Sequence, residues 1–176
     1  MGGTALVLQG HTPYRQWEVY RKGRLVVVAT AEDPAAVRLA EAVAAVLATH
    51  LPESRAMMTR APQTRDLLSL LANRQLDVAL LAVEDARAAV EGRAPATQPV
   101  PLRAIAALGP HVLVCREEVP AARVREIIRA LAEHWAGNAP PDVARPARPD
   151  PAGPPPVHAA ALESWQGHSP VSPAAR

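Results

Sequence analysis

Residues 25–50 read LVVVATAEDPAAVRLAEAVAAVLATH, and this stretch decides the fold. Its first six residues form a short apolar run rich in β-branched side chains, which is typical of a buried parallel strand. Asp33 and Pro34 then supply a helix N-cap and a proline in the first helical turn. The periodic apolar residues that follow predict a helix that reaches about His50 and is ended by Pro52.

The same alternation of strand and helix continues along the chain. Further strands are predicted at 55–59, 77–83, 102–108 and 111–115. Further helices are predicted at 63–73, 84–91 and 119–135. Strands that alternate with helices are typical of βαβ units, in which successive strands lie parallel. The pattern therefore predicts an α/β fold with a mostly parallel sheet.

Composition divides the chain into three parts. Residues 1–23 form an aromatic and basic lead-in segment, residues 24–136 carry the α/β pattern, and residues 137–176 form a proline-rich C-terminal tail. Eight of the 20 residues from 137 to 156 are proline. Such a stretch has little to bury, so we expect an extended linker there. Residues 157–165 are expected to contact the domain again.

Charge and hydropathy argue against two classes of partner. The net charge is only +2, and the arginines are interleaved with acidic residues, so the chain lacks the basic cluster of a nucleic-acid-binding protein. It also lacks the run of about 20 apolar residues needed for membrane insertion. The first ten residues show no secretory signal, which predicts a cytoplasmic protein. A signal missing upstream would instead place the protein in the periplasm.

The residues that usually carry catalysis or bind metals show no productive pattern. Cys115 is the single cysteine and follows an apolar run, so a strand residue is favoured over a reactive thiol. The six histidines have no metal-ligand spacing, and His50 and His134 lie near predicted helix C-termini, where a positive charge is favourable. We find no nucleophile elbow, no phosphate-binding glycine loop and no convergent pair of acids. We therefore expect no catalytic residues, no metal, no cofactor and no enzymatic activity.

The carboxyl ends of the predicted strands supply the candidate ligand site. Thr30 and Thr59 end the first two strands and Arg60 follows the second, so all three belong to the edge where open α/β sheets bind ligands. Helices that begin after Asp33 and at Gln63 would point backbone N–H groups at the same edge, which favours anions. Thr30, Thr59 and Arg60 are thus the candidates for binding a small carboxylate. The alternative is that Asp33 is only an N-cap and Arg60 only a solvated charge.

Tyr14, Trp17 and Tyr20 form a second candidate site, in the lead-in segment. Their spacing of three residues would place them on one face of a helix. That face could pack on the domain, or it could dock a protein partner. The three aromatic residues are therefore the candidates for partner binding.

Together with the strand and helix that lead to residues 50–53 (HLPE), four later segments of the chain resemble the TAXI-type solute-binding proteins of TRAP transporters. Residues 67–77 (LLSLLANRQLD) lead from a helix into a strand, as a leucine-rich turn does in that family. Residues 100–108 (VPLRAIAAL) and 114–132 (VCREEVPAARVREIIRALA) resemble later strands and a Val-Pro turn before a long helix. Residues 155–165 (PPVHAAALESW) are similar to a proline-histidine stretch near the family's C-terminus. The resemblance covers about 25–165.

This resemblance implies a single three-layer α/β lobe of the periplasmic-binding-protein type. Members of the family close two lobes on a solute, and the resemblance predicts only one of them here. The ligand-holding turn of the family is replaced here by residues 31–34 (AEDP), whose Glu32 and Asp33 would repel an acidic ligand. We therefore expect a shortened relative that has lost high-affinity solute transport.

The resulting expectation is a non-catalytic binding module that acts as an accessory or interaction subunit with a protein partner. One alternative is a receptor for a small carboxylate solute of a TRAP transporter, which would need an export signal upstream or a homodimer that rebuilds the cleft between lobes. A second alternative is an effector-sensing regulatory domain.

Overall fold

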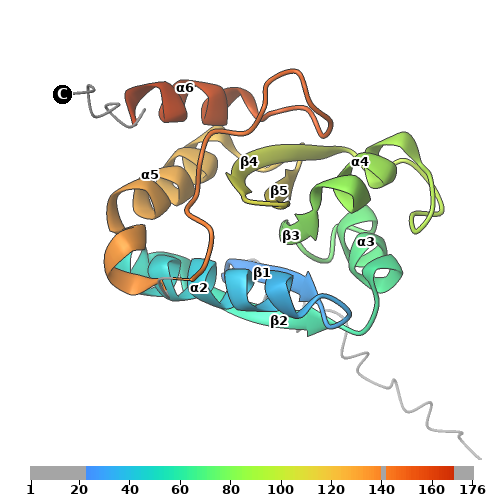
Figure 1. Ribbon diagram of the computed structural model, residues 1–176, viewed down its shortest axis with the longest axis horizontal. Coiled ribbons are helices and arrows are strands. Elements are labelled where there is room, and N and C mark those ends of the chain that lie inside the picture. The colour runs from blue at the N-terminus through green and yellow to red at the C-terminus, as the bar shows by residue number, and fades with distance from the viewer. Residues whose placement is uncertain (1–22, 140–141, 169–176) are drawn as a thin grey trace, which may run out of the picture.

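The computed structural model describes residues 23–139 and 142–168, and their centre is a five-stranded sheet (Figure 1). The strands lie across the sheet in the order β2-β1-β3-β5-β4. In chain order they are β1 (Val26–Thr30), β2 (Met57–Ala61), β3 (Val78–Ala82), β4 (Leu102–Leu108) and β5 (His111–Arg116). The predicted α/β class is therefore confirmed.

The sheet is mixed rather than mostly parallel. β1 pairs in parallel with β2 and β3, whereas β5 pairs antiparallel with both β3 and β4. The reason is the connection between β4 and β5, which consists of Gly109 and Pro110 alone. Two residues can close an antiparallel hairpin but cannot make the long crossover that a parallel pair needs. Gly109 has a φ of 63°, the left-handed conformation that glycine adopts without strain.

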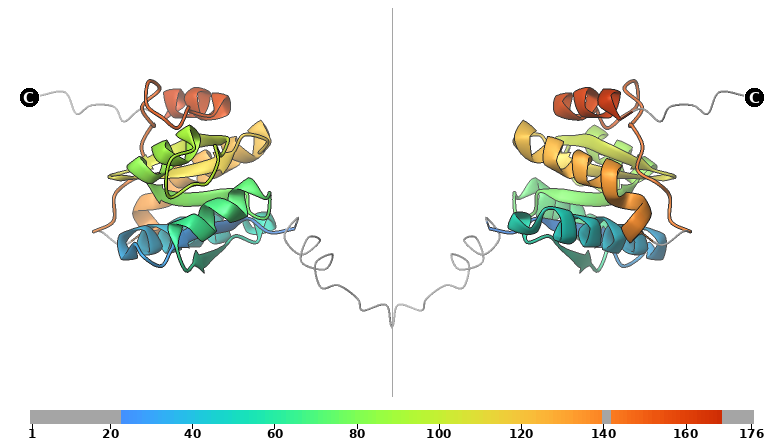
Figure 2. Two further views of the ribbon diagram at one scale, coloured as in Figure 1. Left: turned by 90° about the vertical axis from the view of Figure 1, so that its right-hand side faces the viewer. Right: turned by 90° about the vertical axis from the view of Figure 1, so that its left-hand side faces the viewer.

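Helices cover both faces of the sheet and complete a three-layer lobe (Figures 1 and 2). The helices are α2 (Pro34–His50), α3 (Thr64–Ala72), α4 (Val83–Glu91), α5 (Ala121–Asn138) and α6 (Ala159–Gly167), with a 3-10 turn η1 (Pro52–Ser54) after α2. α2, α5 and α6 bury one face of the sheet and α3 and α4 bury the other. In β1, Val27 faces the first of these cores and Val28 the second, because neighbouring strand residues point to opposite faces.

Local signals explain where most elements begin and end. Asp33 caps α2, since its Oδ1 accepts hydrogen bonds from the N–H groups of Ala35 and Ala36, both at 3.0 Å. Gly92 ends α4 with a φ of 70°, and an added Cβ would lie only 2.8 Å from Cδ of Pro99. β2 begins two residues later than predicted. Arg55 is the cause, because its φ of 46° is left-handed and cannot belong to an extended strand.

The end of α2 meets α5 through two stacked histidines. The imidazole rings of His50 and His134 are stacked, with their centroids 3.7 Å apart and their planes almost parallel, at 8°. His50 is the last residue of α2, as predicted, whereas α5 continues for four residues beyond His134, to Asn138, so His134 does not lie in its last turn. Their role seen here is a contact between helices.

The proline-rich tail lies along the outer edge of β4. Ala107 exchanges two backbone hydrogen bonds with Ala147, of 2.8 and 2.9 Å, and Ala104 donates to Pro156 and accepts from His158 at 2.9 and 3.0 Å. The chain then forms α6, whose buried Trp165 donates from Nε1 to the carbonyl of Ile105 at 2.8 Å. Proline lacks an N–H group but keeps its carbonyl, so a proline-rich segment can still complete a sheet edge through the residues between its prolines.

Candidate functional site

The strand order reverses between β1 and β3, and this reversal places the candidate site. From β1 the chain passes to β2 on one side, and then to β3 on the other. The connections that leave β1 and β3 therefore diverge at their carboxyl ends. Open α/β sheets bind ligands in the crevice at such a switch point. Here that position is bounded by residues 31–33 and 83–85, with the start of β5 beside them.

The structure does not bring the three predicted ligand-binding residues together. Thr30 is buried, and its Oγ1 accepts the N–H of Glu32 at 3.3 Å. Thr59 and Arg60 lie within β2 rather than after it, and as neighbours in a strand they point to opposite faces. Arg60 forms an ion pair with Glu41 of α2 at 2.7 Å. The predicted carboxylate site is thus divided between two faces of the sheet.

The helix N-termini at this edge already bind carboxylates of the chain itself. Asp33 accepts the free N–H groups of α2, as described above. Glu32 reaches across to α3, where its Oε2 accepts two hydrogen bonds from Thr64, one from the backbone N–H at 3.0 Å and one from the side-chain hydroxyl at 3.4 Å. Backbone N–H groups at helix starts are the usual donors to bound anions. The helix N-termini that the sequence predicts as sites for an external anion are therefore occupied by Asp33 and Glu32 of the chain itself.

A buried histidine ties Asp33 to the centre of the sheet. His111 begins β5, its side chain is 7% exposed, and its Nε2 lies 2.7 Å from Oδ2 of Asp33. Its Nδ1 is buried and has no hydrogen-bond partner among the described residues. Burial raises the pKa of Asp33, but the N–H of Ala36, the hydrogen bond and charge of His111, and the N–H of Ala35 outweigh it. The pKa of Asp33 therefore lies below its ordinary value, and Asp33 stays ionised.

Four carboxylates converge at the switch point, and we call them the acidic edge: Glu32, Asp33, Glu84 and Asp85. The last two lie in the first turn of α4, directly after β3. Burial raises the pKa of Asp85, and the negative charges of Asp33, Glu32 and Glu84 raise it further. These groups are thus close enough to repel one another. The sequence signal is the repetition of Glu-Asp after the first and third strands, but only the sheet order shows that the two pairs meet.

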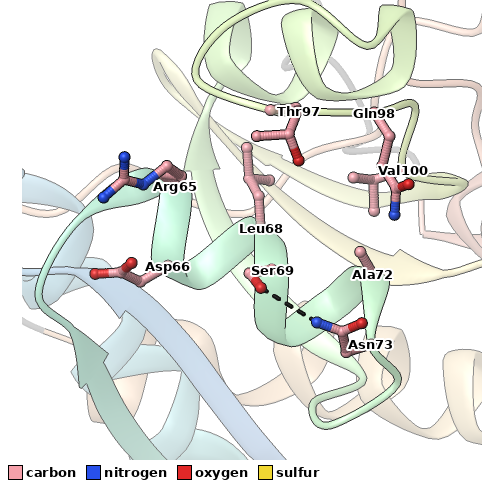
Figure 3. Close-up of a pocket in the computed structure, with 10 residues that line it drawn as sticks. Arg65, Asp66, Leu68, Ser69, Ala72, Asn73, Thr97, Gln98 and Val100 are labelled. Carbon is pink, nitrogen blue, oxygen red and sulfur yellow. Dashed lines mark hydrogen bonds between the residues drawn. The ribbon is translucent and has the colours of Figure 1, made fainter.

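Two hollows of the surface lie away from the acidic edge. One, of about 300 Å³, separates α3 from the loop at 93–101. Figure 3 shows Ser69 on α3 and Asn73 just after its end, joined by a hydrogen bond of 3.2 Å, with Thr97 and Gln98 on the loop. The other, of about 400 Å³, lies at the amino end of β3 beside Arg116. That arginine is bound by Asp77 at 2.6 Å and by Glu118 at 3.1 Å.

Reactive or metal-binding side chains of the described residues do not gather at either of these two hollows. Cys115 is fully buried in β5, and burial, with a smaller effect of Asp77, raises the pKa of its thiol to about 12. Over residues 23–139 and 142–168, no three His, Cys, Asp or Glu side chains are grouped as metal ligands. No helix in this part of the chain has the length and hydropathy to cross a membrane. Tyr14, Trp17 and Tyr20 lie outside the described residues.

Comparison with known proteins adds no family. The chain matches no protein-family model, and no curated protein or solved structure is significantly similar to it. The resemblance to TAXI-type proteins therefore stays a prediction. What can be argued of function depends on the geometry of the acidic edge.

Proposed function

We propose that this chain is a non-catalytic binding domain, built like one lobe of a TAXI-type solute-binding protein, that acts as an accessory subunit. In this proposal the acidic edge binds a basic group of a protein partner. The observation that carries it is that carboxylates of the chain occupy the N-termini of α2 and α3, beside the switch point. This arrangement reverses the charge that such an edge normally offers to a ligand.

The electrostatic argument favours a cation over an anion. An empty helix N-terminus attracts anions, but here Glu32 and Asp33 already accept those N–H groups. Glu84 and Asp85, in the first turn of α4, add two more carboxyl groups at the same end of the sheet. The raised pKa of Asp85 reflects, after burial, the repulsion from these neighbours. An arginine or lysine side chain placed there would relieve that repulsion, whereas a small carboxylate would add to it.

The open geometry favours a macromolecular partner over a small solute. Small ligands are held in cavities that enclose most of their surface. Both hollows described above lie elsewhere, and residues 23–139 and 142–168 place no second lobe over the acidic edge. A protein surface can cover such an edge and bring a basic side chain into it. A receptor for a small carboxylate and an effector-sensing domain remain the alternatives that the following experiment distinguishes.

Calorimetric titration with two peptides of equal length, one arginine-rich and one glutamate-rich, tests the proposal. The basic peptide should bind, and its affinity should fall as salt rises. A variant that combines Glu84→Gln with Asp85→Asn should weaken binding by roughly fivefold, because each surface charge pair contributes a fraction of 1 kcal/mol to about 1 kcal/mol. Glu53→Gln, an exposed acid in η1 at the other end of the sheet, is the matched control and should change little.

Two results would count against this function. Preferential binding of the glutamate-rich peptide would show that the edge selects anions after all. Thermal stabilisation by acetate or another small carboxylate, without binding of the basic peptide, would support the solute receptor instead.

A further inference from the structure

The outer side of β2 offers backbone hydrogen-bonding groups that the described chain leaves unpaired. Met57 donates its N–H to Leu25 at 3.0 Å, and the carbonyl of Ala61 accepts from Ala31 at 2.8 Å. These bonds show that residues 57, 59 and 61 direct their backbone groups toward β1. Since the direction alternates along a strand, the N–H and C=O groups of Met58 and Arg60 point away from the sheet. No described strand or loop pairs with them.

We propose that β2 pairs with β2 of a second copy of this chain, antiparallel, about a two-fold axis that passes between the two Thr59 residues. The two sheets would then form one continuous sheet across the dimer. The occupant of the edge is thus a second copy, because the strand is complementary to itself in this register. This inference is independent of the function proposed for the acidic edge.

Backbone geometry selects the register. With Thr59 at the axis, Met58 of each copy lies opposite Arg60 of the other, and both residues have their backbone groups pointing outward. Each such pair exchanges two hydrogen bonds, which gives four across the interface. This is also the register that pairs all five residues of the strand. Thr59 then faces Thr59, a favourable cross-strand pair.

Charge supports the same register. An axis at Arg60 would place two arginines directly opposite each other, which destabilises a pair of strands. With the axis at Thr59, Arg60 lies beside Met58 of the second copy. The charge of Arg60 stays compensated by Glu41 of its own copy, 2.7 Å away.

Side-chain exposure supports an occupant at this edge. Among the described residues, Met57 is the large hydrophobic side chain that stands exposed, at 39%. In the dimer it would lie opposite Ala61 of the second copy. Natural sheets protect an open edge with proline, charged side chains such as lysine, a bulge or a covering segment. β2 carries one charged side chain, Arg60, which is paired with Glu41. β4 has such a cover, whereas the five residues of β2 include neither proline nor lysine and have no covering segment among the described residues.

Sedimentation equilibrium of the full chain across the micromolar range tests the dimer, with Arg60→Pro and Arg60→Ala as a matched pair. Both variants lose the arginine side chain, but only proline removes the backbone N–H group that points away from the sheet. The hydrogen bonds between β2 and β1 stay intact in both variants. The wild type and Arg60→Ala should sediment at twice the chain mass of 18.7 kDa. Arg60→Pro should weaken dimerisation by about tenfold or more, because each interface loses two of its four hydrogen bonds. A monomeric wild type, or a dimer that Arg60→Pro leaves unchanged, would overturn the proposal.

A disulfide cross-link tests the register. Residues opposite each other in this type of pair have Cα atoms about 4.5 Å apart, which is within the range that a disulfide spans. Thr59→Cys should therefore form a covalent dimer under mild oxidation. Thr97→Cys, on the exposed loop after α4, is the control and should not. The register is wrong if Thr59→Cys stays monomeric while the wild type dimerises, or if both variants cross-link equally.

Hydrogen exchange distinguishes a second copy from another cover. The amides of Met58 and Arg60 should be protected at high protein concentration and exchange faster on dilution. Protection that does not depend on concentration would show that a segment of the same chain covers β2, and the dimer would be excluded.

Discussion

The two edges of the sheet are treated in opposite ways. Along β4, the tail contributes four backbone hydrogen bonds, and α6 places Trp165 over the strand. An ion pair between Arg38 of α2 and Asp142 joins the beginning of that tail to the rest of the lobe. Along the outer edge of β2, no described strand or loop pairs with the backbone. The comparison shows that the C-terminal residues of the described chain cover the β4 edge, whereas the β2 edge stays available to a partner.

The largest effect is expected where the closed edge is anchored. Trp165→Ala should lower the free energy of unfolding by about 3–5 kcal/mol, because it leaves a cavity and removes the donor to the carbonyl of Ile105. Guanidinium denaturation measures this change. Gln166→Ala, the exposed neighbour in α6, should stay within about 0.5 kcal/mol of the wild type. A loss no larger than that of the control would mean that α6 does not hold the edge closed.

The tail itself should contribute less than its anchor. Ala147→Pro removes the N–H that donates to Ala107 and should cost about 1–3 kcal/mol, since the carbonyl of Ala107 loses its partner. Arg148→Pro is the matched control, since the N–H of Arg148 has no backbone partner among the described residues. Equal destabilisation by both prolines, measured by thermal and chemical unfolding, would assign the effect to chain stiffness rather than to the hydrogen bond.

A smaller effect is expected at the contact between Asp33, which follows β1, and His111, which begins β5. Asp33→Ala removes the cap of α2 and the contact with His111, and should cost about 1 kcal/mol at neutral pH. Because folding lowers the pKa of Asp33, its contribution is present above the unfolded value of 3.8 and is lost as pH falls through the folded pKa. The free energy of unfolding, measured against pH, should therefore fall less steeply below that value in the variant. Identical slopes in both proteins would contradict this role.

The smallest effect is expected at the open edge. Arg60→Ala should change the unfolding free energy of the lobe by about 0–1 kcal/mol, because the pair with Glu41 is more than half exposed at both side chains. A double-mutant cycle with Glu41→Ala measures the coupling directly. A coupling energy between Arg60 and Glu41 well above that range would contradict the prediction. It would show that this ion pair stabilises the β2 edge, which, unlike the β4 edge, has no covering segment among the described residues.

Much of this protein follows from the sequence because the signals are local. The cap and proline at Asp33 and Pro34 place the start of α2, and Gly92 ends α4. The apolar run before Cys115 indicates a strand, and the structure buries that residue in β5. Each of these features depends on backbone conformation or side-chain type within a few residues.

Tertiary structure decided what depends on residues far apart in the chain. Pairing places β5 between β3 and β4, which makes the sheet mixed and brings His111 to Asp33. The same order brings Glu32 and Asp85 to one end of the sheet, and it makes β2, which carries Thr59 and Arg60, an edge strand. Strand order and register have no local signature, because they depend on which apolar faces pack together once the whole chain is present. For that reason the sequence predicts the helices and strands of this lobe, and only the folded chain shows where its charges and open backbone groups meet.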